Sequence, residues 1–390
     1  MTSAAVSADR AARAALSALV DPGTPAGVRL ARQVLNEDAS DVLSAIRSGL
    51  STLDRDGRLR RRSGGVDGET LLRHGALVNA RFLCPGDAEW PADVAALELT
   101  DDSGARPGPP PLGLWVRGDP DLAAVTDRSV AVVGARAATE YGVRVAVDLA
   151  AEFAAAGWSV LSGAAYGVDA AAHRGALAAG GMTVAVLACG VDQFYPSANT
   201  TLLQRVAAEG LVVSELPPGS HPTRQRFLAR NRLIAAMTRG TVVVEAATRS
   251  GALNTANWAG DIGRPVAAVP GPVTSSMSAG CHELVRTGAA MLVSSAAEVV
   301  DLVGDLGTDA AADPVRETRP WDQLGPDARE VMEAMPARRI VTVDSICLDT
   351  GMSAARCLGA LAELSLAGMV LSCPDGWRLA PGVTTARGGA

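Results

Sequence analysis

The sequence contains no lysine, and all 35 of its basic residues are arginine. A Walker A phosphate loop, a lysine Schiff base and a Ser-Lys dyad each require a lysine side chain, so these chemistries are excluded. The six cysteines are scattered and form no CxxC pair, which argues against a zinc site or a disulfide framework and is typical of the reducing cytoplasm. No apolar run reaches the roughly 18 residues of a membrane span, and the N-terminus lacks the pattern of a signal peptide. We therefore expect a cytoplasmic protein without a metal site or a membrane partner.

Basic charge is concentrated in one region of a chain that is acidic as a whole. The net charge is −7. Residues 128–300 carry 13 arginines against 11 acidic residues, whereas acidic residues are in excess on either side of this region. Within it, residues 217–250 hold six arginines and a single acid, Glu245. This uncompensated positive charge favours an anionic partner such as nucleic acid.

The sequence pattern divides the chain into an N-terminal, a central and a C-terminal part. Residues 1–80 carry apolar positions at three- and four-residue spacing, which predicts a small helical bundle. Residues 81–300 form the central domain, and a polar, acidic linker at 301–320 follows it. Residues 321–381 combine three helical segments with a terminal hairpin, the pattern of a winged helix. We expect the tail at 382–390 to be disordered.

Short Val-rich runs alternate with helical segments between residues 128 and 300. Such continuous apolar runs are typical of buried parallel strands. Their alternation with helices predicts an α/β fold with an extended Rossmann-like, doubly wound and mostly parallel sheet. A further short strand is expected at 114–118, where this domain begins. The strands expected within 128–300 are Val130–Val133, Ser159–Leu161, Thr183–Leu187, Leu211–Val213, Thr241–Val244, Pro265–Val269 and Ala290–Leu292.

Candidate anion ligands follow the first two of these strands, at the edge where parallel sheets bind ligands. Gly134 and Arg136 come after the first strand, in the segment GARAAT, which lacks the GxGxxG pattern of a dinucleotide site. The planar guanidinium of Arg136 can pair two phosphate oxygens, or it can pair a carboxylate such as Asp169 for structural reasons. Ser162 and Gly163 end the second strand, and their hydroxyl and turn amides are candidates to hold a phosphate.

Phenylalanine and tyrosine are rare in the chain and gather near its arginines. They total seven residues. Four of them lie between positions 166 and 227, namely Tyr166, Phe194, Tyr195 and Phe227. Aromatic rings beside cationic groups hold single-stranded nucleic acid by stacking on its bases. The alternative is that these rings are loop side chains tucked into the core.

The segment at 221–240 predicts a helix with the richest group of candidate ligands. Arg226, Arg230 and Asn231 are four or five residues apart and are expected to share one face. Phe227 and Arg232 adjoin them. With the apolar positions of this helix turned inward, its arginines are expected to point outward and contact phosphates. A solvated face without a partner is the alternative.

Further charged candidates lie at another strand end and outside the sheet. Ser250 and Gly251 open a helix shortly after a strand, and Glu245 at the end of that strand is either an acid–base group or a partner that orients an arginine. Residues 55–62 contain five arginines, which form either a solvated segment or an auxiliary DNA contact. Residues 322–381, by contrast, hold five arginines against eight acidic residues. Because a winged helix that reads duplex phosphates should be basic, we expect this module to contact protein.

These segments together resemble the bacterial DNA-processing protein A family, also called DprA or Smf. The motifs that carry the resemblance span residues 81–300 in the family's order: PGDAEWP, LWVRGD, VAVVGARAATEYG, SGAAYGVDAAAH, VLACGVDQFYPSAN, FLARNRLIAAM, SGALNTA and VPGPV. The resemblance implies a homodimeric Rossmann-like protein that binds single-stranded DNA and loads the RecA recombinase on it during natural transformation.

By this resemblance, the VVGAR arginine, the Ser-Gly turn, the YPxxN loop and the RNR helix line the DNA pocket. The residues concerned are Arg136, Ser162, Gly163, Tyr195, Asn199, Arg230, Asn231 and Arg232. Relatives often use lysines in this pocket, whereas this chain has only arginines to offer.

We predict a non-catalytic protein, without a cofactor, that binds and protects single-stranded DNA and loads RecA during DNA uptake and recombination. The predicted DNA-binding residues are Gly134, Arg136, Ser162, Gly163, Tyr195, Asn199, Arg226, Phe227, Arg230, Asn231, Arg232, Ser250 and Gly251. The main alternative is a Rossmann-type enzyme that cleaves the base from nucleoside monophosphates, with Glu245 and Arg136 catalytic. The PGGxGT phosphate loop of those enzymes is missing, since Pro272 and Val273 follow the PG pair here. A scaffold whose arginine face binds an acidic protein is a third alternative.

Overall fold

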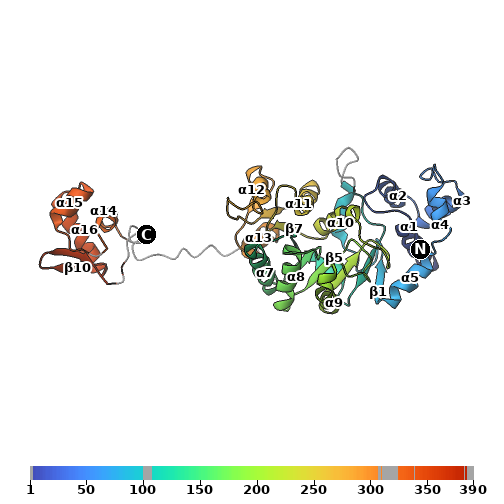
Figure 1. Ribbon diagram of the computed structural model, residues 1–390, viewed down its shortest axis with the longest axis horizontal. Helices are drawn as coiled ribbons and strands as arrows, with labels where there is room; N and C mark the ends of the chain where they lie inside the picture. The colour runs from blue at the N-terminus through green and yellow to red at the C-terminus, as the bar shows by residue number, and fades with distance from the viewer. Residues whose placement is uncertain are drawn as a thin grey trace. The chain divides into compact units, whose positions relative to one another are not determined.

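The computed structural model describes residues 3–99, 108–305, 309, 324–337, 339–381 and 383 (Figure 1). The chain divides into two compact units, Met1–Ala311 and Ala312–Ala390. No helix in these described ranges is both long and apolar enough to cross a membrane. The predicted tail at 382–390 lies outside the described residues except for residue 383. So does most of the predicted linker, whose first residues belong instead to the helix α13 (Ala296–Val303).

The first unit is built on a nine-stranded sheet with the order β1-β2-β6-β5-β4-β3-β7-β8-β9. Strands β3 to β9 run parallel to one another, and β1 and β2 extend the sheet in antiparallel fashion beyond β6. The predicted doubly wound, mostly parallel sheet is therefore confirmed. The strands are β1 (Ala80–Leu83), β2 (Leu114–Arg117), β3 (Ser129–Val133), β4 (Ser159–Ser162), β5 (Thr183–Val186), β6 (Leu211–Ser214), β7 (Gly240–Val243), β8 (Val266–Ala268) and β9 (Met291–Leu292).

All seven strands expected within 128–300 are present, each within one residue of its expected ends. The short strand expected at 114–118 is β2. Strand β1 was not predicted, because its four residues are too few to show a period and its partner β2 lies about thirty residues further on.

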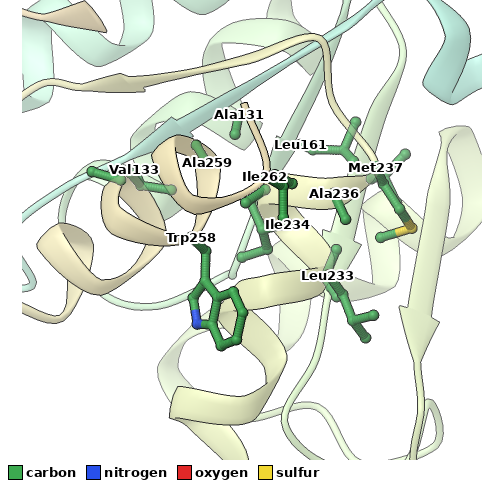
Figure 2. Close-up of a cluster of buried hydrophobic side chains, with 14 of the residues drawn as sticks. Ala131, Val133, Leu161, Leu233, Ile234, Ala236, Met237, Trp258, Ala259 and Ile262 are labelled. Atoms are coloured by element: carbon green, nitrogen blue, oxygen red, sulfur yellow. The ribbon is translucent and has the colours of Figure 1, made fainter. Parts of the chain in front are cut away.

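Alternate residues of each strand face opposite sides of the sheet, so each side has its own core. In β3, Val130 and Val132 pack with α7 (Glu140–Ala155), α8 (Val168–Ala178) and α13. Ala131 and Val133 face the other core, which α10 (Arg224–Ala236) and α11 (Gly251–Asp261) cover with Leu233, Ile234 and Trp258 (Figure 2). The sheet region also contains α6 (Leu122–Asp127), α9 (Thr200–Glu209), α12 (Ala279–Arg286) and the 3-10 helices η1 (Ala92–Leu99) and η2 (Ser197–Asn199).

The helix α10 is more deeply buried than its sequence suggests. It begins after Thr223, whose hydroxyl accepts a hydrogen bond from the Arg226 amide. Residues 229–236 are then all buried, because η1, α11 and β5 pack around the helix. An amphipathic surface helix would bury one stripe only, so polar side chains of this stretch have to find partners inside the protein.

Five helices precede the sheet and belong to the same compact unit. They are α1 (Ser3–Leu19), α2 (Pro25–Asn36), α3 (Ala39–Ser48), α4 (Arg58–Ser63) and α5 (Gly68–Leu77). Apolar side chains of α1 to α4 form their own core, which includes Leu16, Leu30 and Ile46. Arg10 joins this bundle to the sheet region, since its guanidinium donates to the carbonyl of Phe82 and pairs with Asp87 at 2.7 Å.

The second unit has the winged-helix pattern predicted for it. Three helices, α14 (Pro326–Ala334), α15 (Val343–Thr350) and α16 (Ala354–Leu366), precede an antiparallel hairpin of β10 (Val370–Cys373) and β11 (Gly376–Leu379). Its core is separate from those of the first unit and includes Val331, Ile346 and Leu361.

Candidate nucleic-acid interface

A cavity of about 390 Å³ opens beyond the carboxyl ends of the central strands. Its walls are the loop after β3, the turn between β4 and α8, one side of α10 and the start of α11. Because β4, β3 and β7 are adjacent in the sheet, their loops converge where open α/β sheets bind ligands. The polar and glycine residues that line it include Gly134, Arg136, Asp169, Arg230, Asn231, Ser250, Gly251 and Thr255. A Cβ at Gly134 would lie 2.5 Å from Val168, so only glycine lets the β3 loop approach α8 this closely.

Two arginines flank a single aromatic ring in this cavity. The guanidinium carbon of Arg136 lies 4.9 Å from the centre of the Phe227 ring, and that of Arg230 lies 5.9 Å from it. Tyr195, which is 46% exposed, places its ring 5.9 Å from the Phe227 ring at an angle of 53°. Arg136 is exposed, and no carboxylate of the described residues forms an ion pair with it. The structural alternative, an Arg136–Asp169 pair, is therefore wrong, and this cation stands beside an aromatic ring at the surface.

Arg230 forms the floor of the cavity and is only 6% exposed. Its Nη1 donates to the carbonyl oxygens of Gly163 (2.8 Å) and Val186, and its Nε donates to Oδ1 of Asn231 (3.2 Å). Burial lowers the pKa of Arg230 to about 10, while the Asp169 carboxylate acts in the opposite direction, so the guanidinium stays charged at neutral pH. A Cβ at Gly163 would lie 2.3 Å from Nη1 of Arg230. Gly163 therefore serves the site by leaving room for Arg230.

Asp169 is the acidic residue of the cavity wall, and it was not among the residues predicted to bind DNA. Its carboxylate is buried and accepts a hydrogen bond from the Ala165 amide at 3.3 Å. Burial raises the pKa of Asp169, and the positive charges of Arg230 and Arg136 partly offset this effect. The lining residues thus include two cations and one anion, which leaves the cavity positive.

Ser162 and Asn199 shape the turn after β4 from inside the protein. The Ser162 hydroxyl donates to the Val132 carbonyl at 2.7 Å, so it is directed at the sheet and not at the cavity. Nδ2 of Asn199 donates to the carbonyl oxygens of Ala164 (3.0 Å) and Ala165 (3.3 Å). Ala164 has a φ of +54°, a left-handed conformation that costs a residue with a Cβ roughly 1–2 kcal/mol. The two hydrogen bonds from Asn199 help to hold this strained turn.

The prediction that the arginines of α10 point outward holds for Arg224, which is exposed, but is wrong for Arg226, Arg230 and Arg232. Arg232 is 2% exposed, and its guanidinium grips both oxygens of Glu215 at 2.7 and 2.9 Å inside the protein. Nε of Arg226 donates to Oδ1 of Asp21, between α1 and α2, at 2.8 Å. Of these three arginines, Arg230 lines the cavity. Helical spacing alone could not separate them, because α10 has packing partners on several sides.

The start of α11 forms the opposite wall of the cavity. Ser250 caps this helix by accepting a hydrogen bond from the Ala252 amide at 3.3 Å. Nδ2 of Asn231 donates to the carbonyl of Gly251 (3.3 Å) and to Oδ1 of Asn254 (3.2 Å), which ties α10 to α11. The amino end of α11 thus adds partial positive charge to the cavity.

Glu245 lies just after β7, and its buried carboxylate holds the start of α7. It is 2% exposed, and its carboxylate accepts hydrogen bonds from the Thr139 amide (2.9 Å) and hydroxyl (2.6 Å) at the start of α7. A Cβ at Gly142 would lie 2.2 Å from it, so the carboxylate is enclosed. Both expectations for Glu245, an acid–base role and the orientation of an arginine, are therefore wrong.

Thr255 and Met277 also line the cavity and were not predicted. Thr255 lies one turn into α11, and Met277 lies in the loop before α12, where its carbonyl accepts from the Ala246 amide at 2.7 Å. Neither residue carries a sequence signal that distinguishes it from ordinary packing residues.

The sheet and its edge define a Rossmann-like α/β protein that presents cations and an aromatic ring in place of a glycine-rich nucleotide loop. The chain belongs to the DNA recombination-mediator protein A family, whose model matches residues 81–304. A second model, described as the DprA winged helix domain, matches residues 315–376. The resemblance noted in the sequence is thereby confirmed.

Individual relatives match over most of the chain. The chain is 46% identical over 369 residues to the putative DNA processing protein DprA of Mycobacterium tuberculosis (strain ATCC 25618 / H37Rv), a match that covers 93% of this chain and 92% of the relative. Protein Smf of Escherichia coli (strain K12) is 33% identical over 303 residues, which is 76% of each chain. The X-ray structure of DNA processing protein A from Streptococcus pneumoniae superimposes with a TM-score of 0.61 at 31% identity, covering 75% of this chain and 96% of that one.

Proposed function

We propose that the protein binds single-stranded DNA at the sheet-edge cavity, protects it, and delivers it to the RecA recombinase during DNA uptake and recombination. The observation that carries the proposal is the pair of arginines that flank Phe227, at 4.9 and 5.9 Å from its ring. An exposed cation beside a partly exposed ring offers one contact to a phosphate and one to a base. Membership of a DNA recombination-mediator family agrees with this role.

The cavity suits a single strand better than a duplex. A base can stack on Phe227 or Tyr195 only when its own faces are free, which is not the case inside a base-paired helix. The recognition would be independent of sequence, because stacking and phosphate contacts are available to every nucleotide.

In this role the protein is non-catalytic, and the alternative is an enzyme that cleaves the base from nucleoside monophosphates. One observation favours that enzyme: Asp169 lies in the cavity wall with a raised pKa, as a general acid would. Against it, Asp169 is buried beside Arg230, and Glu245 is enclosed at the start of α7. Incubation with the four nucleoside monophosphates discriminates between the two, since release of free base would establish the enzyme.

The partners beyond DNA are a second copy of the chain, RecA, and a protein that contacts the winged-helix unit. That unit is acidic overall and exposes Leu348 (86%), Leu358 (49%) and Leu366 (91%) on α15 and α16. Exposed leucines on an acidic module suit protein contact better than contact with phosphates. Removal of residues 310–390 should therefore leave the affinity for single strands within a few-fold, and a hundredfold loss would refute this role.

Binding of labelled oligo-thymidylate and of a matched duplex, each measured across salt concentrations, tests the proposed function. We expect the single strand to bind more tightly, and Arg136→Ala to weaken it and to reduce the slope of log K against log salt by about 0.7. Arg144 is a matched control, because it is exposed on α7 and faces Asp148 one turn along. Equal binding of wild type, Arg136→Ala and Arg144→Ala, with equal slopes, would refute the proposal.

A further inference from the structure

A second, larger groove lies between α2 and α4 of the N-terminal helices. Its volume is about 1290 Å³, more than three times that of the sheet-edge cavity. Five arginines line it, together with two acids, Asp21 and Asp56. The arginines are Arg29, Arg55, Arg58, Arg61 and Arg62.

The two acids of the groove leave most of its positive charge uncompensated. Asp21 is engaged by Arg226 of α10. Asp56 faces Arg58 at 3.6 Å in an exposed pair, which is worth little in water. Among the described residues, no acid forms an ion pair with Arg29, Arg55, Arg61 or Arg62.

Two of these arginines are held in place by the backbone. Nη1 of Arg61 donates to the Asp56 carbonyl at 3.3 Å, and Nη2 of Arg62 donates to the Ala18 carbonyl at 3.2 Å. The groove therefore presents positioned positive charge, since these two side chains have given up part of their rotamer freedom.

The groove is joined directly to the DNA cavity through α10. The Arg226–Asp21 ion pair connects the helix to the groove wall, and Phe227, the next residue, lines the cavity. Gly23 packs so tightly on α10 that a Cβ there would lie 2.9 Å from Cβ of Ala229. Both sites thus lie in one compact unit, and contacts with α10 link them, although no residue lines both.

We infer that the groove between α2 and α4 is a second contact for the phosphate backbone, which holds the same single strand after it leaves the sheet-edge cavity. This inference rests on the proposed function of the cavity. No aromatic side chain lines the groove within the described part of the chain, so it offers ionic contacts without stacking. Such a contact adds affinity that depends on strand length and salt and not on base sequence.

A triple substitution, Arg29→Ala with Arg55→Ala and Arg61→Ala, tests the inference on two lengths of oligo-thymidylate. Lengths of about 6 and about 30 nucleotides bracket the site sizes of single-strand grooves. We expect the longer strand to bind at least about tenfold more weakly at physiological salt, with a salt slope reduced by about 2 units, as the loss of three phosphate contacts predicts. The shorter strand should bind as it does to the wild type, because the cavity is untouched.

Two further variants distinguish the loss of groove contacts from the effect of a lower net charge and from misfolding. The triple change Arg144→Ala, Arg205→Ala and Arg286→Ala removes the same charge from exposed helix pairs elsewhere and should leave both strands bound as before. The triple change Arg29→Lys, Arg55→Lys and Arg61→Lys keeps the charge and should restore most of the affinity for the longer strand.

Four results would overturn the inference. The longer strand could bind the groove variant as tightly as the wild type, while Arg136→Ala still weakens both lengths; the proposed function would then stand alone. The control triple variant could lose as much affinity as the groove variant. The groove variant could lose affinity for a duplex or for a poly-glutamate peptide while it keeps that for the longer strand. If the wild type failed to bind either strand, the inference would fall together with the proposed function.

Discussion

The guanidinium carbon of Arg136 and the ring of Phe227 lie 4.9 Å apart, although 91 positions separate them in the chain. The contact brings the loop after β3 together with α10, so that a charge and a stacking surface lie side by side. The salt dependence of DNA affinity should distinguish the contributions of these two groups, because ionic contacts release counterions whereas stacking does not.

Phe227→Ala should weaken single-strand binding by about 1–3 kcal/mol, the usual cost of losing one stacked base. The salt slope should stay as in the wild type, since no charge is lost. Fluorescence anisotropy titrations at several salt concentrations measure both quantities. Phe227→Trp is the control, because it keeps an aromatic surface and should retain binding. A reduced slope in the Ala variant, or no loss of affinity, would contradict the stacking role.

Gly163→Ala should damage the cavity through Arg230. The new Cβ would lie 2.3 Å from Nη1 of Arg230, so the guanidinium has to leave its bond to the Gly163 carbonyl. We expect weaker DNA binding and a loss of roughly 1–3 kcal/mol in the free energy of unfolding. Gly260→Ala on α11 is a matched control, because a Cβ there meets nothing within 4 Å. It should leave binding unchanged; equal effects of the two variants would refute the role of Gly163.

Arg232→Ala should destabilise the fold and spare the site. The change leaves the Glu215 carboxylate, 12% exposed, without its partner, and breaking a buried ion pair in this way costs about 3–5 kcal/mol. Urea unfolding measures the loss. The double variant Arg232→Met with Glu215→Leu removes both charges and should recover much of the stability. Single-strand affinity of the folded variant should match the wild type, and lost affinity without lost stability would place Arg232 in the interface after all.

His173 should make the protein less stable in acid. It is fully buried, Nδ1 lies 2.8 Å from the Thr183 hydroxyl, and Nε2 has no partner among the described residues. Burial, assisted by the charges of Arg230 and Arg174, lowers the pKa of His173 to about 3. Between about pH 6.5 and pH 3, His173 is protonated in the unfolded chain but neutral in the folded protein. The free energy of unfolding therefore falls as the pH is lowered through this range.

The loss attributable to His173 is about 1.4 kcal/mol for each pH unit within that window. Chemical unfolding of wild type and His173→Gln at a series of pH values isolates this contribution. The slopes of the free energy of unfolding against pH should differ by the amount that one proton produces. Asp169, whose pKa is raised by burial, acts in the opposite direction, but it is present in both proteins and cancels. Parallel stability curves would show that His173 titrates alike in the folded and unfolded states, which would contradict the lowered pKa.

The sequence predicted the sheet well because buried parallel strands leave a strong signal. The first two runs end at small residues, and the position of Arg136 just beyond the first of them was enough to place it at the ligand edge. The rarity of phenylalanine and tyrosine in the same way drew attention to Phe227, which lies at the centre of the cavity contacts.

The directions of the α10 side chains could not be predicted, because their partners are remote in the chain. Arg226 pairs with Asp21, 205 positions away, and Arg232 pairs with Glu215, 17 positions away and just after β6. Helical spacing gives the angle between two side chains but not which neighbours will pack on each side. The hydroxyl of Ser162 was misjudged for the same reason, since its acceptor belongs to the neighbouring strand.

Three of the four arginines of α10 each have a different partner, so the length of this helix affects several parts of the protein at once. Within two turns, the helix ties down the N-terminal bundle through Arg226, supplies the cavity floor through Arg230 and closes an interior ion pair through Arg232. Insertion or deletion of one residue after Thr223 would rotate everything beyond it by about 100°. Natural variation in this chain should therefore tolerate exchanges of side chains along α10 far better than any change in its residue count.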